Sequence, residues 1–196
     1  LQATGRVAPA AFVEADAISR AVLEAPSLDT GLKGWAHAIL ADALLWQGRA
    51  HDIPDVAAED VDPLGPGVLA RVYEIRMRWL LARGQIFDAG ICVERLRTLA
   101  SGTDEPVARV IACQAELTGL AASGDLTRIR QAFDCAMDAA RAARMPMRAA
   151  WARLTWVDAA RRAGRTDTIA SHLQCLGRLA RIAPPLLQRE IARRLS

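Results

Sequence analysis

The chain is poor in aromatic residues, which make up 5% of its 196 residues, and it lacks runs of β-branched residues. Such runs are typical of β-strands, whereas the alanine and leucine that dominate this sequence favour helices. No apolar run reaches the length of about 18 residues that a transmembrane helix needs, and no signal peptide opens the chain. At 52% hydrophobic, it can still bury a sizeable core. We therefore expect an all-α protein that does not cross a membrane.

The four cysteines lack the spacing of a metal site. Cys92, Cys113, Cys135 and Cys175 are separated by wide intervals and form no CxxC pair. Zinc ligands cluster at short spacings, so we expect no metal, and no motif suggests another cofactor. Each cysteine lies among small apolar residues of a helical stretch. We expect all four to be buried and reduced, as in a cytoplasmic protein.

Lysine is almost absent, since Lys33 is the only one and the other 24 basic residues are arginine. This bias is more typical of a GC-rich genome than of a function. The formal net charge is +3, spread over the chain, whereas nucleic-acid-binding proteins have a dense basic patch. We therefore expect no nucleic-acid partner for this segment.

Catalytic motifs are also missing. The histidines, His37, His51 and His172, form no HExxH motif and no visible triad, and the sequence contains no GxSxG, P-loop or GxGxxG. The carboxylates are scattered, without a pair placed for acid–base chemistry. His172 occupies an apolar seam of its expected helix, which predicts a packed side chain rather than a ligand. The sequence predicts that the chain is not an enzyme.

What the chain does have is prolines at a fixed interval. Pro26, Pro66, Pro106 and Pro146 recur every forty positions, and Pro185 follows after thirty-nine. A fixed period of about 20 to 50 residues is the signature of a repeat architecture. Proline is tolerated at the first position of a helix, where its missing N–H would have no partner. Each proline therefore predicts the start of a helix and of a repeat. The expected repeats span about 26–65, 66–105, 106–145 and 146–185.

Glycines mark a turn inside each repeat. Gly84, Gly124 and Gly164 each stand eighteen positions after one of these prolines. Gly48 stands twenty-two positions after Pro26, so the first repeat carries about four extra residues. Glycine readily adopts the left-handed conformation that ends a helix. Each of these glycines therefore predicts the end of a first helix and the approach of a second.

Apolar residues keep one register relative to the four glycines. They stand seven and four residues before each glycine, and five and nine residues after it. Twelve residues after the glycine, three repeats hold an apolar residue and the first holds Asp60. Steps of three and four place them on one helix face, which predicts the core. The predicted core residues are Ala41, Leu44, Ile53 and Ala57, then Met77, Leu80, Ala89, Val93 and Leu96, then Leu117, Leu120, Ile129, Phe133 and Ala136, and finally Val157, Ala160, Ile169, Leu173 and Leu176.

The two ends of the array are expected to be irregular. Pro54 and Pro63 should cut short the second helix of the first repeat, and residues 58–67 favour a loop. A helix over about 8–25, with Phe12, Ile18 and Val22 in step, should precede the repeats. An amphipathic helix should follow Pro185. We expect about ten helices in one continuous stack.

Two segments resemble tetratricopeptide repeats. Residues 83–100, RGQIFDAGICVERLRTLA, have that family's turn glycine, an alanine five residues later, and small or apolar residues at steps of three and four. Residues 17–26, AISRAVLEAP, resemble the closing end of such a repeat. The forty-position period is longer than the usual period of about 34 residues, and Ala41, Met77, Leu117 and Val157 replace the family's first-helix glycine. The resemblance implies one tetratricopeptide-like domain over residues 1–196, with antiparallel helix pairs in a right-handed superhelix.

The resemblance also implies a concave groove, lined by the positions thirteen, ten and six before each glycine. These positions hold Trp35, Ala38 and Asp42, then Arg71, Glu74 and Arg78, then Ile111, Gln114 and Thr118, then Trp151, Leu154 and Asp158. Aromatic and arginine side chains anchor many interfaces. Two alternatives stay open, because Trp35 and Trp151 fit a core equally well and Arg71 and Arg78 fit a solvated helix face.

Similar long repeats occur in large bacterial transcription regulators and signalling proteins, as sensor or docking arms. The sequence therefore predicts a protein-interaction or regulatory module that docks a peptide, a helix or a sister domain of the same polypeptide. The alternative is a small-ligand sensor with an apolar pocket between helices and an arginine anchor. A nucleic-acid-binding superhelix is disfavoured by Asp42, Glu74 and Asp158 in the groove. Self-association through the open ends of the stack would suit any of these functions. The chain begins with leucine, so we expect it to be part of a longer protein.

Overall fold

The computed structural model describes residues 9–27, 29–54, 65–121 and 124–195, and these residues are helical, without a β-strand. The chain divides after residue 108 into two compact units, an N-terminal unit (residues 9–108) and a C-terminal unit (residues 109–195). The helices are α1 (Pro9–Leu23), α2 (Thr30–Trp46), α3 (Pro66–Ala82), α4 (Ile86–Ser101), α5 (Pro106–Ala121), α6 (Leu126–Ala142), α7 (Pro146–Arg162), α8 (Ala170–Leu179) and α9 (Pro185–Leu195), with 3₁₀ turns η1 (Ala50–Asp52) and η3 (Thr166–Thr168).

Four of the five expected helix starts are confirmed. α3, α5, α7 and α9 begin at Pro66, Pro106, Pro146 and Pro185. The described residues hold nine α-helices rather than about ten, because η1 is all that follows Gly48 there. Residues 58–64 of the expected loop lie outside the described residues. The helical prediction is therefore confirmed in class, and the part of the chain that the structure describes holds one α-helix fewer than expected.

The expectation for Pro26 is wrong, because this proline lies in the turn between α1 and α2. Helix α2 begins at Thr30, after Asp29, whose carboxylate accepts hydrogen bonds from the N–H groups of Gly31 (2.8 Å) and Leu32 (3.4 Å). An aspartate cap satisfies donors that would otherwise lack a partner, so it fixes where a helix begins. The extra residues of the first repeat thus precede its helix. As a result, α2, α3 and α7 are each 17 residues long.

The four predicted turn glycines adopt the left-handed conformation. Gly48, Gly84, Gly124 and Gly164 have φ angles of +74°, +74°, +81° and +70°. After α3, the N–H of Gly84 donates to the carbonyl of Leu81 (3.1 Å) and the N–H of Gln85 donates to that of Leu80 (2.9 Å). This pair of bonds is the Schellman motif, which supplies partners for the last carbonyls of a helix. The same pair of bonds closes α2 and α7.

One arginine stands where this motif would favour glycine. Among the described residues, Arg144 is the non-glycine residue with a positive φ, +54°. Its N–H donates to Arg141 (3.0 Å), and the N–H of Met145 donates to Ala140 (2.8 Å), so α6 ends in the same motif. A side chain in the left-handed region crowds its own backbone. The chain therefore tolerates strain at this single helix end.

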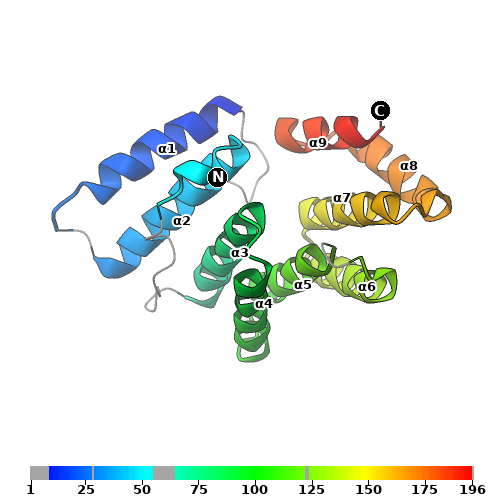
Figure 1. The fold of residues 1–196 in the computed structure, drawn as a ribbon, viewed down its shortest axis with the longest axis horizontal. Helices are drawn as coiled ribbons and strands as arrows, with labels where there is room; N and C mark the ends of the chain where they lie inside the picture. Colours follow the sequence, from blue (N-terminus) through cyan, green and yellow to red (C-terminus); the bar gives the residue numbers. More distant parts are fainter. Residues whose placement is uncertain (1–8, 28, 55–64, 122–123, 196) are drawn as a thin grey trace. The chain divides into compact units, whose positions relative to one another are not determined.

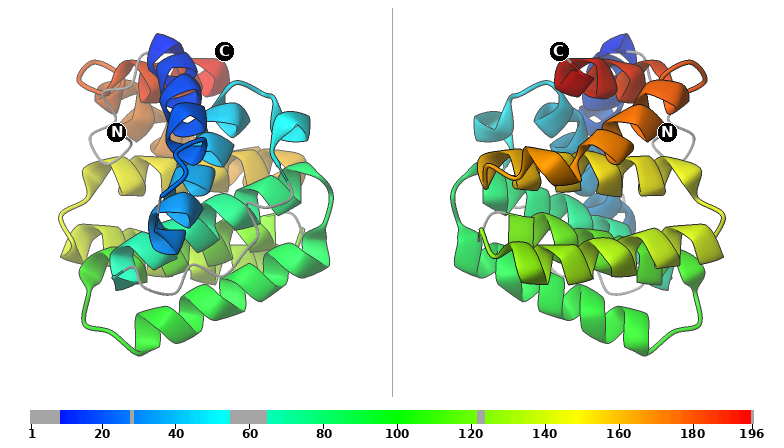
Figure 2. Two further views of the ribbon diagram at one scale, coloured as in Figure 1. Left: turned by 90° about the vertical axis from the view of Figure 1, so that its left-hand side faces the viewer. Right: turned by 90° about the vertical axis from the view of Figure 1, so that its right-hand side faces the viewer.

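The predicted core register is confirmed where the structure describes it. In the N-terminal unit, α1 packs on α2, α2 on α3, and α3 on α4, as the neighbouring ribbons of Figures 1 and 2 show. In the C-terminal unit, α7 packs against α6, α8 and α9. Ala57 lies outside the described residues, and Val93, Leu120 and Leu173 are partly buried. Every other predicted core residue is buried, including Met77, Leu96, Leu117, Val157 and Leu176 at 1% exposure or less.

Two predicted contacts of α1 are wrong. Phe12 is buried and stacks on Trp46 with ring centroids 5.9 Å apart, whereas Ile18 and Val22 are exposed. The Phe12 contact sets the rotation of α1, so the buried positions are those three, four and seven residues later: Ala15, Asp16 and Ser19. Ile18 and Val22 fall outside that stripe.

The cysteine prediction holds for two residues and fails for two. Cys92 and Cys113 are buried, whereas Cys175 is partly buried and Cys135 is exposed; all four are free thiols. Cys135 and Cys175 both lie eleven residues after a turn glycine, a position where α4 carries the exposed Arg95. Burial, with a smaller contribution from Cys135, raises the pKa of Cys113 to about 12. That thiol therefore stays protonated and unreactive.

The strain at Arg144 predicts opposite effects for two substitutions. Arg144→Gly should raise the free energy of unfolding by up to about 1 kcal/mol, because glycine relieves the left-handed strain. Gly84→Ala should lower it by about 1 kcal/mol through φ alone, because a Cβ there meets no atom within 4 Å. Urea unfolding followed by circular dichroism measures both. A loss of stability in Arg144→Gly would contradict the account.

Candidate functional site

Four of the predicted groove residues meet in one ion-pair network in the N-terminal unit. Asp42 of α2 accepts from Arg78 (2.8 Å) and from Arg71 (3.1 Å), and Arg71 also pairs with Glu74. Asp42 and Glu74 are each only 6% exposed. The arginines come from α3, so the network joins α2 to α3. These side chains are engaged with one another rather than directed to an open groove.

The network keeps Arg71 charged. Burial alone would lower the pKa of the Arg71 guanidinium, but the carboxylates of Glu74 and Asp42 outweigh burial and raise it. The Arg78 guanidinium also lies over the ring of Trp46, 4.7 Å from its centroid, where a cation–π contact adds to the pairing. Arg71 and Arg78 therefore form neither a solvated helix face nor an open anion grip, the two interpretations that the sequence left open.

The groove positions of the C-terminal unit are also used within the chain. Gln114 accepts from Arg148 (3.1 Å), and the Thr118 hydroxyl donates to the carbonyl of Gln114 (2.8 Å). Asp158 of α7 accepts from Arg194 of α9 (2.7 Å), which ties these helices together. Ile111 and Leu154 are buried. The predicted groove line therefore lies mostly between helices.

The two tryptophans of the predicted groove have intermediate positions. Trp151 is partly buried and packs against the core of the C-terminal unit. Trp35 of α2 is partly buried, and Ala38, one turn further on, is buried. Neither ring is fully open to a partner. We therefore place the candidate site elsewhere.

An exposed apolar surface covers part of α3 and α4. We define the apolar surface by Leu69, Tyr73, Ile86, Phe87, Ile91 and Leu99, which line a hollow of about 780 Å³ together with Gly90, Glu94, Arg95 and Thr98. Phe87 is 82% exposed, Ile86 64% and Ile91 44%. Large apolar side chains this exposed, and adjacent to one another, are typical of interaction sites.

The repeats themselves provide a comparison for this surface. Phe87 and Ile91 lie three and seven residues after the turn glycine Gly84. At the same positions the third and fourth repeats carry exposed polar residues: Thr127, Gln131, Asp167 and Ser171. Packing between helices therefore does not need apolar residues there. Core positions alone do not predict this site, although the register that aligns them also aligns the outward positions and shows Phe87 and Ile91 as the apolar exceptions.

Charged residues border the apolar surface and are held by neighbours. The Arg95 guanidinium donates to the Tyr73 hydroxyl (3.1 Å) and lies 5.6 Å from the centre of that ring. Glu94 accepts from Arg97 at 2.8 Å. An apolar centre with a polar rim is the usual anatomy of a protein interface. The arrangement offers binding area and no reactive group.

His172 is packed, as the sequence predicts. Its ring meets that of Phe133 edge to face at 5.2 Å, and its Nδ1 lies 3.0 Å from Nη1 of Arg153. Burial, followed by the charges of Arg153 and Arg130, lowers the pKa of His172. The imidazole is therefore held neutral.

No described residues form a group of three or more potential metal ligands. No helix in the described ranges is both long enough and apolar enough to cross a membrane. No protein-family model matches the chain, and no curated protein or solved structure matches it either.

The buried network predicts a large cost for removing its shared carboxylate. Asp42→Ala should lower the free energy of unfolding by about 3 kcal/mol, because it leaves Arg78 and part of Arg71 unpaired in a buried site. Asp134→Ala is the matched control, since its pair with Arg130 has both side chains more than half exposed. That control should cost less than about 0.5 kcal/mol. Equal effects in denaturant titrations would contradict the network's role.

The lowered pKa of His172 predicts a pH effect on stability. Below its ordinary pKa the unfolded chain binds a proton that the folded chain resists, so acid favours unfolding through this residue. The effect should be absent at pH 7.5 and should grow as the pH falls below about 6.5. Unfolding free energies of the wild type and of His172→Gln, measured at pH 7.5 and 5.5, test this. The wild type should lose more stability than the variant; equal losses would contradict the assignment.

Proposed function

We propose that the chain is a non-catalytic protein-interaction module, and that the apolar surface on α3 and α4 binds the apolar face of a partner helix. The observation that carries the proposal is the exposure of Phe87 and Ile91 at positions that are polar in the other repeats. Packing within the fold does not explain why Phe87 and Ile91 are apolar. A binding role does.

The energetics support a docking role. Burying a phenylalanine or isoleucine side chain contributes about 1.5 to 3 kcal/mol, so contact with a partner would remove an unfavourable exposure. Aromatic residues at the centre of a patch are typical anchors of binding energy. Phe87 and Ile91 are one helical turn apart, and Tyr73 of α3 lines the other side of the hollow. A hollow between two helices suits the ridge of a third helix.

We further propose the setting that the tetratricopeptide-like resemblance implies. The module would belong to a cytoplasmic bacterial regulator of transcription or signalling, and its partner would be a separate protein or another domain of the same polypeptide. A partner of either kind would bring one apolar helix face to the surface. Regulation would follow from whether that helix is docked or free.

The small-ligand sensor keeps one supporting observation. A volume of about 780 Å³ falls in the usual range for ligand pockets, about 300 to 1,000 Å³, and Arg95 stands at its edge. However, Phe87 is 82% exposed, so the hollow opens widely to solvent, and the Arg95 guanidinium already binds Tyr73. A ligand pocket normally encloses most of its ligand. The geometry therefore favours a helix over a small molecule.

Replacing Phe87 and Ile91 by the residues at the same positions of α6, Thr127 and Gln131, should weaken docking strongly. We expect a phage-displayed library of helical peptides, selected on the wild type, to yield sequences with apolar residues at i, i+3 or i+4, and i+7. These peptides should bind Phe87→Thr/Ile91→Gln at least about thirtyfold more weakly, because an aromatic anchor contributes about 2 kcal/mol or more. Fluorescence anisotropy of the selected peptides measures the change.

The matched control is Gln131→Ser, which gives α6 the residue that the last repeat carries at the same position. Binding to this control should equal wild-type binding. Selected peptides that bind the double variant as well as the wild type would overturn the site. A specific rise in Tm with small metabolites, in the absence of peptide binding, would support the sensor instead.

A further inference from the structure

The charges of the chain are segregated along it. Residues 8–108 carry 15 acidic and nine basic residues, whereas residues 109–196 carry seven acidic residues and 15 arginines. The formal net charges are −6 and +8. The expectation that a mild positive charge is spread over the chain is therefore wrong. The small total conceals a strongly basic C-terminal unit.

Carboxylates of the C-terminal unit are largely used within it. Asp134, Asp138, Asp158, Asp167 and Glu190 each pair with an arginine. Asp125 caps the start of α6 by accepting from the backbone of Thr127 and Arg128. Five exposed arginines then have no ion pair or side-chain hydrogen bond to the described residues. These free arginines are Arg109, Arg128, Arg144, Arg178 and Arg181.

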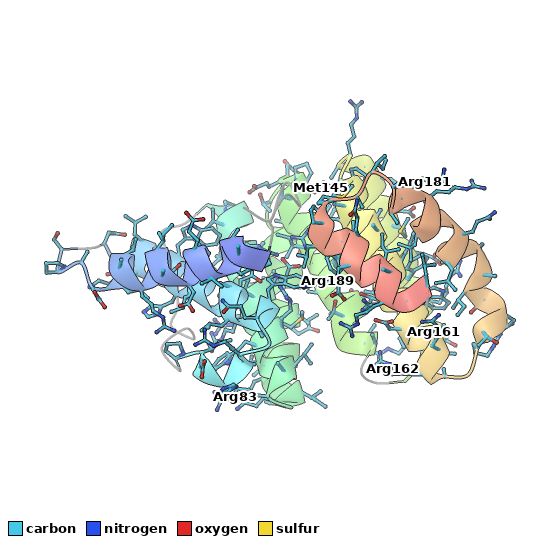
Figure 3. The ribbon with its side chains drawn as sticks, turned by 90° about the horizontal axis from the view of Figure 1, so that it is seen from above. Arg83, Met145, Arg161, Arg162, Arg181 and Arg189 are labelled. Atoms are coloured by element: carbon cyan, nitrogen blue, oxygen red, sulfur yellow. The ribbon has the colours of Figure 1, made fainter. Side chains whose placement is uncertain are left out.

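Arg144 and Arg178 lie at the ends of α6 and α8, which both pack on α7 after short connections, so the two arginines lie at the same end of the C-terminal unit. Arg128 lies at the start of α6, which is the opposite end of that helix. Arg178 lies in the last turn of α8, and Arg181 follows soon after it, with its side chain extending away from the ribbon in Figure 3. Arg144 keeps its place after α6 despite a left-handed backbone that favours glycine. The other Schellman ends carry glycine at this position.

The structure also removes the objection that acidic groove residues raised. Asp42 and Glu74 are neutralised by Arg71 and Arg78, and Asp158 is neutralised by Arg194. None of these three carboxylates presents an unbalanced negative charge. Two reasons argued from the sequence against a nucleic-acid partner: an evenly spread charge and acidic residues in the groove. Neither reason holds for the C-terminal unit.

We propose that the C-terminal unit binds the phosphate backbone of a nucleic-acid duplex through the free arginines at the ends of α6 and α8, Arg144, Arg178 and Arg181, a function beyond the docking proposed for α3 and α4. The arginine guanidinium matches phosphate oxygens bidentately and keeps its charge at any physiological pH. A single strand would need exposed aromatic rings for stacking. Phe133 and Trp156 are buried and Trp151 is partly buried, so the unit offers a charged surface without a stacking platform. Contacts to the backbone alone make the binding independent of sequence.

The test uses the full chain and a short fluorescein-labelled DNA duplex of mixed sequence. Fluorescence anisotropy should show binding whose log K falls linearly with log salt between about 50 and 200 mM, with a slope near −0.9 per phosphate contact. The variant Arg144→Gly/Arg178→Ser/Arg181→Ser should bind at least about tenfold more weakly at the lowest salt, with a slope reduced by about two to three. Because Arg144→Gly relieves strain, unfolding would not explain such a loss.

A second triple variant separates the free arginines from total charge. Arg20→Ser/Arg83→Ser/Arg97→Ser removes the same charge from exposed positions of the N-terminal unit. It should bind the duplex within about twofold of the wild type, because phosphate contacts act locally. An equal loss in both triple variants would overturn the proposal.

The remaining outcomes also decide the matter. Failure of the wild type to bind the duplex at low salt would overturn the proposal. So would a poly-glutamate peptide that binds more tightly than the duplex, since that result would identify an acidic protein as the partner. A labelled single strand that binds more tightly than the duplex would contradict the absence of stacking platforms. The proposal would be supported if the wild type binds the duplex more tightly than it binds poly-glutamate or the single strand, and if this binding is lost in the first triple variant and kept in the second.

Discussion

The structure depends on one local constraint, which is where a helix can begin and end. Proline at the first helical position gives up only an N–H that had no partner, and glycine with a positive φ lets the last carbonyls find theirs. Pro66 fixes where α3 begins and Gly84 fixes where it ends. Pro146 and Gly164 do the same for α7 at the same interval. Helix length is thereby set by the backbone chemistry of the residues at the two helix ends.

Fixed helix ends make the repeats comparable residue by residue. The residues seven before and five after each glycine can then be assigned to the core, as the burial of Met77 and Ala89 shows. The same alignment separates residues that serve the fold from residues that do not. Phe87 stands at an outward position that Thr127 and Asp167 occupy elsewhere, so its apolar character has to be explained by something outside the repeat.

Much of the fold could be predicted because its signals are local, and less of the site because it depends on pairs of helices. The start of α3 at Pro66 and the turn at Gly84 follow from single residues. The start of α2 was misplaced because Asp29 caps it, and the rotation of α1 was misjudged because its contact with Trp46 is tertiary. The pairing of Asp42 with arginines of α3 could not be read from spacing. The unusual apolar character of Phe87 and Ile91 can be predicted from the sequence when the outward positions of the repeats are aligned.

The central claim is that the exposed apolar residues of α4, Phe87 and Ile91, serve binding and not the fold. The most direct measurement is the free energy of unfolding of Phe87→Thr/Ile91→Gln, obtained by urea titration beside the wild type. Because both positions tolerate polar residues in the other repeats, the value should stay within about 0.5 kcal/mol of the wild type. A loss of more than about 2 kcal/mol would show that these side chains are part of the core, and would contradict the claim.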